Sequence, residues 1–367
     1  MADEVAQFMK DCYTNSKSDL FAAFIERCTD FAQRGGAAAM ITMQSWMFLS
    51  SFEKLRSSLL RHQQISSMLH LGTRAFDSIG GEVVSSTAFV LANDPGRRAG
   101  SFVRLVDGNS EAEKSAALTS ALATQTREVA YYRASSSDFG TVPGSPITYW
   151  LSEKMRRVFA DSANIGEHFD AIAGISTGDN GRFFRYWYEV SADRILGDSE
   201  EAPWAPHHKG GASRKWAGNV EHVLRYSGSS VHQMKLLPGF RHDGSSDYFK
   251  RHVGWSALTS GPPSFRWIPA GSTFGSGSKA LMISGDTAMA QIAVLNSALA
   301  LSLLNALSPT MNYEVGHILN LPISPSSVGG ELLSRASSLI AESQHDWDEA
   351  ETSFGFEVDP LVIVARE

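Results

Sequence analysis

Cysteine is scarce in this sequence of 367 residues. Only Cys12 and Cys28 are present, and no Cys or His stands at a zinc-ligand spacing from them. Two thiols cannot form a disulfide framework, so the composition excludes a disulfide-stapled scaffold and favours a reducing compartment. The opening residues, MADEVAQF, lack a basic region followed by an apolar one, so we expect no signal peptide and a cytoplasmic protein.

Long apolar runs and an excess of basic charge are also lacking. The longest apolar stretch, residues 288–307, is interrupted by Gln, Asn and Ser, which predicts a buried or half-buried helix rather than a membrane span. Lys and Arg number 32 against 39 Asp and Glu, a net charge of −7. This balance argues against a chain that is basic throughout, but it leaves room for a local basic site. With 43% hydrophobic residues, the chain has enough apolar material for a sizeable core.

The first 108 residues alternate helical and strand patterns. Helices are expected at residues 16–34, with Ser16 or Ser18 as N-cap, and around residues 52–60. Strands are expected at four places, the last two pairing antiparallel across a turn at residues 93–96. These four strands are residues 37–42, 65–71, 82–92 and 101–106. The order is typical of an α/β fold, the C-terminal half of a doubly wound Rossmann-like sheet.

The remaining chain divides by composition into three parts. Residues 109–149 are expected to form a helical linker and a loop rich in Ser, Pro and Gly. Residues 150–325 hold many Gly, Trp, Ser and His residues with short strand-like runs, which predicts a mixed α+β domain. Residues 326–367 are expected to form a helical, acidic C-terminal extension.

A local basic segment lies within this acidic chain. Residues 207–252 contain eight Lys and Arg against three Asp and Glu, six of the eleven histidines, and interleaved aromatic residues. Cations beside aromatic rings suit a surface that follows a phosphate backbone; the alternative is a solvated face over core aromatics. The adjacent His207 and His208 have no partner at ligand spacing, so no metal site is expected.

A second polar cluster is the glycine-rich loop at residues 174–182 (GISTGDNGR). Its polar side chains either close a turn of the Asx type or offer hydrogen bonds to DNA. Spacing alone does not separate these alternatives.

Longer blocks of the sequence carry a resemblance. They are residues 16–27 (SKSDLFAAFIER), 41–51 (ITMQSWMFLSS) and 71–84 (LGTRAFDSIGGEVV), with shorter matches at 176–183, 209–216, 265–266, 308–322 and 347–353. In these blocks the chain resembles the PglX-like adenine-specific DNA methyltransferases of BREX-type phage-defence systems. That family transfers a methyl group from S-adenosylmethionine to N6 of an adenine that is flipped out of the duplex.

Two motifs of that family are not found in these residues. The sequence has no FxGxG cofactor loop and no Asn-Pro-Pro-Tyr loop; its one Pro-Pro pair, Pro262-Pro263, stands before Ser264. The resemblance therefore implies the C-terminal portion of a methyltransferase, without a complete catalytic set or the main cofactor motif. It implies double-stranded DNA as a partner, a separate polypeptide with the N-terminal half, and other defence-system subunits as possible partners.

The resemblance also assigns candidate roles. Phe76 is a candidate for stacking on the flipped base, with a core aromatic as the alternative. Ser18 and Asp19 are pocket candidates, with a helix N-cap as the alternative, and Gln44, Ser45 and Trp46 are further pocket candidates at the end of a strand. The DNA-contact candidates are polar or basic residues of the second domain: Thr177, Asp179, Asn180, Arg182, Lys209, Arg214, Lys215 and Arg266.

Three functions remain open from the sequence. The first is the recognition part of an adenine-N6 methyltransferase that needs its other half. The second is a non-catalytic DNA-recognition module, and the third is a truncated, inactive fragment. Co-purification with a cofactor-binding half separates the first from the others.

Overall fold

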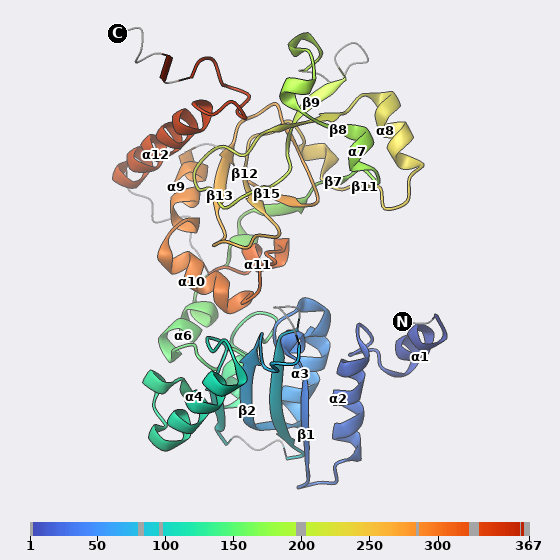
Figure 1. Cartoon of the computed structure of the whole chain (residues 1–367), viewed down its shortest axis with the longest axis vertical. Coiled ribbons are helices and arrows are strands. Elements are labelled where there is room, and N and C mark those ends of the chain that lie inside the picture. The colour runs from blue at the N-terminus through green and yellow to red at the C-terminus, as the bar shows by residue number, and fades with distance from the viewer. Residues whose placement is uncertain are drawn as a thin grey trace. The chain divides into compact units, whose positions relative to one another are not determined.

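The computed structural model describes residues 3–79, 84–94, 98–195, 203–283, 286–322, 330–359 and 361–362. The chain divides into two compact units, Met1–Asp161 and Ser162–Glu367. Each unit has its own hydrophobic core. Figure 1 shows that the strands of each unit also form separate sheets.

Unit 1 is an α/β unit built on one five-stranded sheet. The expected strand at residues 82–92 is shorter where it is described, as β3, because residues 80–83 lie outside the described part of the chain. The elements are α1 (Asp3–Cys12), α2 (Leu20–Phe31), β1 (Ala37–Met43), η1 (Gln44–Met47), η2 (Ser50–Phe52), α3 (Glu53–His62), β2 (Gln64–Gly72), β3 (Ser86–Ala92), β4 (Gly100–Arg104), α4 (Glu111–Thr124), η3 (Arg127–Val129), β5 (Tyr131–Ala134), α5 (Ser136–Phe139) and α6 (Glu153–Asp161).

The strand order in unit 1 is β1-β3-β2-β4-β5. Strand β3 pairs antiparallel with both β1 and β2, and β4 pairs parallel with β2. The expected antiparallel pairing of residues 82–92 with 101–106 is therefore wrong. Both edges of β3 are already occupied by β1 and β2, so β4 uses the other edge of β2. Strands β1, β2 and β4 consequently run in one direction.

Alternate residues of these strands face two different cores. Met68, Phe89 and Phe102 pack with α2 and α3 on one face. Their neighbours Leu69 and Val103 pack with α4 on the opposite face. Helices thus cover both faces of the sheet, as the α/β prediction requires.

The start of the first expected helix differs from the prediction. Helix α2 begins at Leu20 with Asp19 in the N-cap position, and the Asp19 side chain makes no capping bond. The Ser16 hydroxyl instead donates to the Glu26 carboxylate at 2.6 Å. Neither Ser16 nor Ser18 caps the helix.

Residues 109–149 differ from the expected linker. They contain α4 and β5, and β5 pairs antiparallel with β4 at the edge of the first sheet. The boundary between the units lies after Asp161. The β4–β5 hydrogen bonds are the physical reason, because they join this segment to the sheet of unit 1.

Unit 2 is a mixed unit with short strands in two four-stranded sheets and one two-stranded sheet. The orders are β14-β9-β10-β8, β13-β12-β15-β6 and β11-β7. The elements are η4 (Ile165–Glu167), β6 (Asp170–Ala173), β7 (Ile175–Ser176), α7 (Asn180–Phe183), β8 (Phe184–Tyr186), η5 (Trp187–Glu189), η6 (Ala192–Arg194), β9 (Trp204–His208), β10 (His222–Arg225), α8 (Gly228–Lys235), β11 (Arg241–His242), η7 (Ser245–Asp247), β12 (His252–Ser256), β13 (Phe265–Ile268), β14 (Thr273–Phe274), β15 (Ser278–Met282), α9 (Asp286–Leu295), α10 (Ala298–Leu307), α11 (Val315–Leu319) and α12 (Gly330–Asp348).

The apolar stretch at residues 288–307 forms two helices instead of one. The Ser297 side chain accepts a hydrogen bond from the backbone N–H of Ala300 and so caps α10. Asn296, just before it, binds both the N–H and the carbonyl of Phe265. Among the described residues, no single helix is long and apolar enough to cross a membrane. Helices α9 and α10 have that length and apolarity only when taken together, and the chain bends by 70° between them.

Candidate functional site

The carboxyl ends of β1, β2 and β4 meet at one edge of the first sheet. The segments that follow these strands begin at Gln44, Thr73 and Leu105. This is the edge where α/β sheets bind their ligands. Figure 1 shows α2 and β1 running in opposite directions, so the start of α2 lies toward the same end.

Gln44 takes part in a hydrogen-bond network that the sequence analysis missed. Nε2 of His70 lies 2.8 Å from Oε1 of Gln44, and Nδ1 of His70 lies 2.9 Å from the hydroxyl oxygen of Tyr149. Because the amide oxygen only accepts, Nε2 of His70 donates and Nδ1 accepts from Tyr149. The network therefore holds the oxygen of the Gln44 amide toward His70.

His70 is neutral in this setting. Burial, followed by the charges of the nearby Arg104 and Lys114, lowers its pKa to about 3. Lys114 reaches this edge from α4 and donates to the carbonyls of Leu71 and Leu105. The Arg104 guanidinium lies 5.9 Å from the ring centroid of Trp150, whose ring also packs near His70. The edge thus combines fixed cations, a neutral imidazole and aromatic rings.

Phe76 lies in the segment after β2 and is 36% exposed. The next residue, Asp77, exchanges two backbone-to-carboxylate hydrogen bonds with Glu111 at the start of α4. These bonds hold the segment against α4 and leave the Phe76 ring partly open to solvent. The core-aromatic alternative for Phe76 does not match this placement.

The other pocket candidates have different environments. Trp46 is 1% exposed and packs edge-on against Phe89, with ring centroids 5.0 Å apart, so it belongs to the core. Ser45 is half-buried, whereas Ser18 and Asp19 are exposed. Of the five pocket candidates, Gln44 and Ser45 have the partial exposure at the strand end that a ligand contact needs.

In unit 2, the loop before α7 is a turn of the Asx type that also exposes polar groups. Thr177 is fully buried, and its hydroxyl donates to Oδ1 of Asn180 at 2.9 Å. Asp179 caps α7 by accepting from the N–H of Arg182. The Arg182 guanidinium donates to Oε1 of Gln233 on α8 at 2.6 Å. Thr177 and Asp179 shape the loop, and Asp179, Asn180 and Arg182 are exposed.

Gly178 lets this loop pass close to the end of α8. It has a φ of +78°, and a Cβ there would lie 2.8 Å from Cβ of Leu237. Any other residue would be strained and would clash. The loop and α8 therefore form one surface.

The basic candidates at residues 209–266 divide into one exposed side chain, two half-buried ones and one that is fully buried. Lys209 is exposed. The Arg214 guanidinium donates to Ser343 and Asp346 and stacks on Trp347, which holds α12 in place. The Lys215 ammonium donates to the carbonyl of Asn296.

Arg266 is fully buried. Its guanidinium donates to the hydroxyls of Ser256 and Ser264 and to Nε2 of His208. Burial lowers its pKa to about 10, so it remains charged at neutral pH. This placement is incompatible with the expected DNA contact, because the guanidinium is buried and binds groups inside the protein.

Three of the six histidines of the basic segment are internal. His207, His208 and His252 are fully buried. Burial lowers the pKa of His207 to about 3 and that of His252 to about 4. These histidines therefore add no charge to the surface at neutral pH. Over the described ranges, no three His, Cys, Asp or Glu side chains gather in a group that could hold a metal ion.

The chain is similar in sequence to known DNA methyltransferases. The Eco57I restriction-modification methylase family matches residues 1–76. Over 99% of its length the chain is 37% identical to the adenine-specific methyltransferase PglX of Lacticaseibacillus casei (strain Zhang) and 32% identical to the adenine-specific methyltransferase BrxX of Escherichia coli O9:H4 (strain HS). The resemblance to PglX-like adenine-specific methyltransferases is confirmed. The chain spans about 31% and 29% of the length of these two relatives.

The fold also resembles solved restriction-modification enzymes. The Type IIL enzyme MmeI in complex with DNA matches all of the chain with a TM-score of 0.59 at 9% identity, and the chain covers 50% of it. The Type ISP enzyme LlaGI in complex with a DNA substrate mimic matches 92% of the chain with a TM-score of 0.54 at 10% identity, and the chain covers 33% of it. At these identities the likeness is one of fold.

Proposed function

We propose that these 367 residues form the target-recognition part of a site-specific adenine-N6 DNA methyltransferase of a phage-defence or restriction-modification system. In this proposal, unit 1 completes a methyltransferase sheet together with a cofactor-binding half that holds S-adenosylmethionine, and unit 2 contacts double-stranded DNA. The observation that carries the proposal is an incomplete sheet in unit 1.

The incomplete part of the sheet is β1. Over the described ranges, β1 pairs with β3 and its other edge has no strand partner. Met40 faces the core, whereas Ile41 is 60% exposed and Met43 is 41% exposed. An open edge with exposed apolar side chains favours pairing with a further strand.

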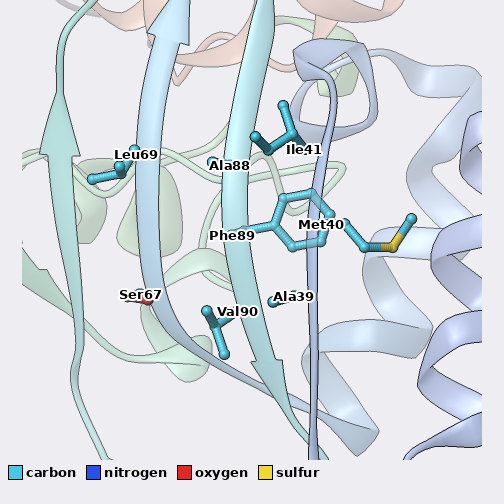
Figure 2. Close-up of a pocket in the computed structure, with 8 residues that line it drawn as sticks. All are labelled: Ala39, Met40, Ile41, Ser67, Leu69, Ala88, Phe89 and Val90. Carbon is cyan, nitrogen blue, oxygen red and sulfur yellow. The ribbon is translucent and has the colours of Figure 1, made fainter. Parts of the chain in front are cut away.

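On the face that carries α4, the part of the sheet toward β1 is open, since Ala39 and Ile41 are exposed. Figure 2 shows the residues of β1, β2 and β3 around this hollow. Its volume is about 330 Å³. Ala39, Ile41, Leu69 and Val90 contribute apolar side chains to it. A helix of the cofactor-binding half would cover this face while its adjoining strand extends the sheet beyond β1. We call the open edge of β1 and this hollow the docking surface. We expect it to bind the partner segment that carries the two motifs not found in this sequence.

Unit 2 supplies the DNA contacts in this proposal. Asn180, Arg182 and Lys209 are exposed, and their side chains can bind base edges or phosphates. The solved relatives named above were bound to DNA or to a DNA mimic, which supports the assignment. Thr177 and Asp179 shape the glycine-rich loop. Arg214 and Lys215 instead bind α12 and the carbonyl of Asn296.

The test supplies the cofactor-binding half as a separate chain. We expect the 367-residue chain to bind no S-adenosylmethionine by calorimetry. Mixed with the N-terminal part of the PglX relative, it should form a complex that transfers tritium-labelled methyl groups to DNA. Ile41→Glu should weaken this complex at least about tenfold, equivalent to about 1.4 kcal/mol, because it charges the docking surface. Co-purification and filter-bound radioactivity measure the two effects.

The matched control is Leu122→Glu, on α4. Leu122 is 53% exposed, so the substitution adds the same charge to another apolar surface position of unit 1. It should leave assembly unchanged. Micromolar cofactor binding by the chain alone, or the absence of both complex and methyl transfer, would contradict the proposal.

A further inference from the structure

A row of exposed aromatic rings lies on the edge strand of one sheet in unit 2. Tyr186 ends β8, which pairs with β10 at the edge of its sheet, and Tyr188 follows in η5. The two rings are stacked, with centroids 5.3 Å apart and planes 4° apart. Tyr186 is 42% exposed and Tyr188 is 56% exposed. A stacked pair with this much exposed ring surface is available to a flat partner.

The row continues to a cation. The His222 ring lies 4.7 Å from the Tyr186 ring, and Nζ of Lys209 lies 3.5 Å from Nε2 of His222. Burial, followed by the charge of Lys209, lowers the pKa of His222 to about 4, so this ring is neutral at pH 7. The order along the surface is Tyr188, Tyr186, His222, Lys209: three neutral rings and then one exposed ammonium.

The backbone under the row is held rigidly. Trp187, between the two tyrosines, donates from Nε1 to the carbonyl of Thr352 and packs against Phe354. Its backbone N–H donates to the carbonyl of Glu221. The ring pair therefore does not need to be ordered when a partner binds, which lowers the entropic cost of contact.

Two carboxylates limit what the tyrosine end can bind. The side chain of Glu189 accepts from the N–H of Tyr186 at 2.7 Å. The pKa of the Tyr188 hydroxyl is raised by burial first, then by Tyr186, and then by the nearby carboxylates of Glu189 and Glu221. Carboxylates at this end disfavour a phosphate there. The neutral rings fit the flat face of a base or a deoxyribose, and the phosphate belongs at the Lys209 end.

We propose that the Tyr186–Tyr188 pair is a non-ionic DNA contact that packs on a base or sugar face, next to a phosphate contact at Lys209. The inference rests on the proposed DNA-binding role of unit 2 and extends it to residues outside the glycine-rich loop. The exposed polar residues of that loop lead through α7 directly into β8, so both contacts lie on one continuous stretch of chain. Base stacking on aromatic side chains is tolerant of sequence, so the pair would add affinity without selecting a sequence.

The test is duplex binding by the 367-residue chain, measured by fluorescence anisotropy from about 50 to 200 mM salt. The double variant Tyr186→Ala/Tyr188→Ala should bind at least about tenfold more weakly with an unchanged salt slope, because no phosphate contact is lost. Lys209→Ala should reduce the slope by about 0.9. Tyr186→Phe/Tyr188→Phe keeps the rings and should bind like the wild type.

Met311→Ala is the control for removal of exposed apolar surface in unit 2, since Met311 is 59% exposed. It should not change binding, and all the variants should melt like the wild type. Wild-type binding that the double alanine variant leaves intact would overturn this inference alone and assign the rings to a protein partner. Failure of the wild-type chain to bind any duplex would overturn the proposed function together with the inference.

Discussion

At the scale of single residues, the same side-chain type has opposite roles in unit 2. Arg182 is exposed on the glycine-rich loop, whereas Arg266 is fully buried under a set of hydroxyl, imidazole and carbonyl acceptors. The family resemblance made both of them DNA-contact candidates. Their environments separate a surface cation from an internal one that organises β12 and β13.

Arg266→Met tests the internal role. We expect it to lower the free energy of unfolding by about 1–3 kcal/mol, because Ser264 and His208 lose their partner in a buried site. Arg182→Met, at an exposed position, should change it by no more than about 0.5 kcal/mol. Urea denaturation followed by tryptophan fluorescence measures both. Equal unfolding midpoints for the wild type and Arg266→Met would contradict the structural role.

At the scale of elements, local pattern predicted the main helices and strands of unit 1 but not how the strands pair. Residues 37–42, 65–71 and 101–106 were expected as strands and appear as β1, β2 and β4. The partner of β4 was predicted wrongly because adjacency in sequence suggested a hairpin. Pairing depends on which edges are free, and β3 offers none after β1 and β2 have paired with it.

The break between α9 and α10 supports a prediction at this scale. Ser297→Ala removes the side chain that caps α10 and should lower the free energy of unfolding by about 1 kcal/mol. Ser302→Ala, within the same helix, is the matched control. Ser302 is exposed and donates to the carbonyl of Ala298 four residues earlier, so its loss should be nearly neutral. Equal effects of the two substitutions on thermal denaturation would show that the cap contributes nothing.

At the scale of the whole molecule, buried neutral histidines make stability depend on pH. The folded-state pKa is lowered to about 3 for His70 and His207 and to about 4 for His252, against an ordinary value of 6.5. As pH falls below about 6.5, the unfolded chain takes up protons that the folded chain refuses. The free energy of unfolding therefore decreases with acidification until the folded-state pKa values are reached.

We expect the urea midpoint to fall steadily from pH 7 to pH 5, with each such histidine contributing up to about 1.4 kcal/mol per pH unit. His252→Gln should flatten this dependence, since Gln can still donate to the carbonyl of Lys250 that His252 now binds. His232→Gln, at an exposed position, should leave the dependence unchanged. A midpoint that is constant over this range would contradict burial of neutral histidines.

The candidate site depends on contacts between distant residues. The sequence placed Gln44 at the end of a strand, and this assignment stays a prediction. In the structure Gln44 binds His70, which is 26 residues away, and His70 binds Tyr149, a further 79 residues along the chain. Nothing in local sequence connects them. Tyr186 and Tyr188 were part of an aromatic stretch whose exposure became evident in the structure. Exposure depends on the neighbours that tertiary packing provides.

The sequence by itself determined the α/β character of the first part, the local basic segment and the likeness to adenine-specific methyltransferases. These follow from short-range periodicity and from residue identity, which need no knowledge of contacts. Tertiary structure alone decided that Arg266, His207 and His208 are internal and that β4 lies beside β2. It also decided that one edge of β1 has no partner strand in the described part of the chain. Burial and strand pairing are properties of residues distant in sequence, so they are settled only when the chain has folded.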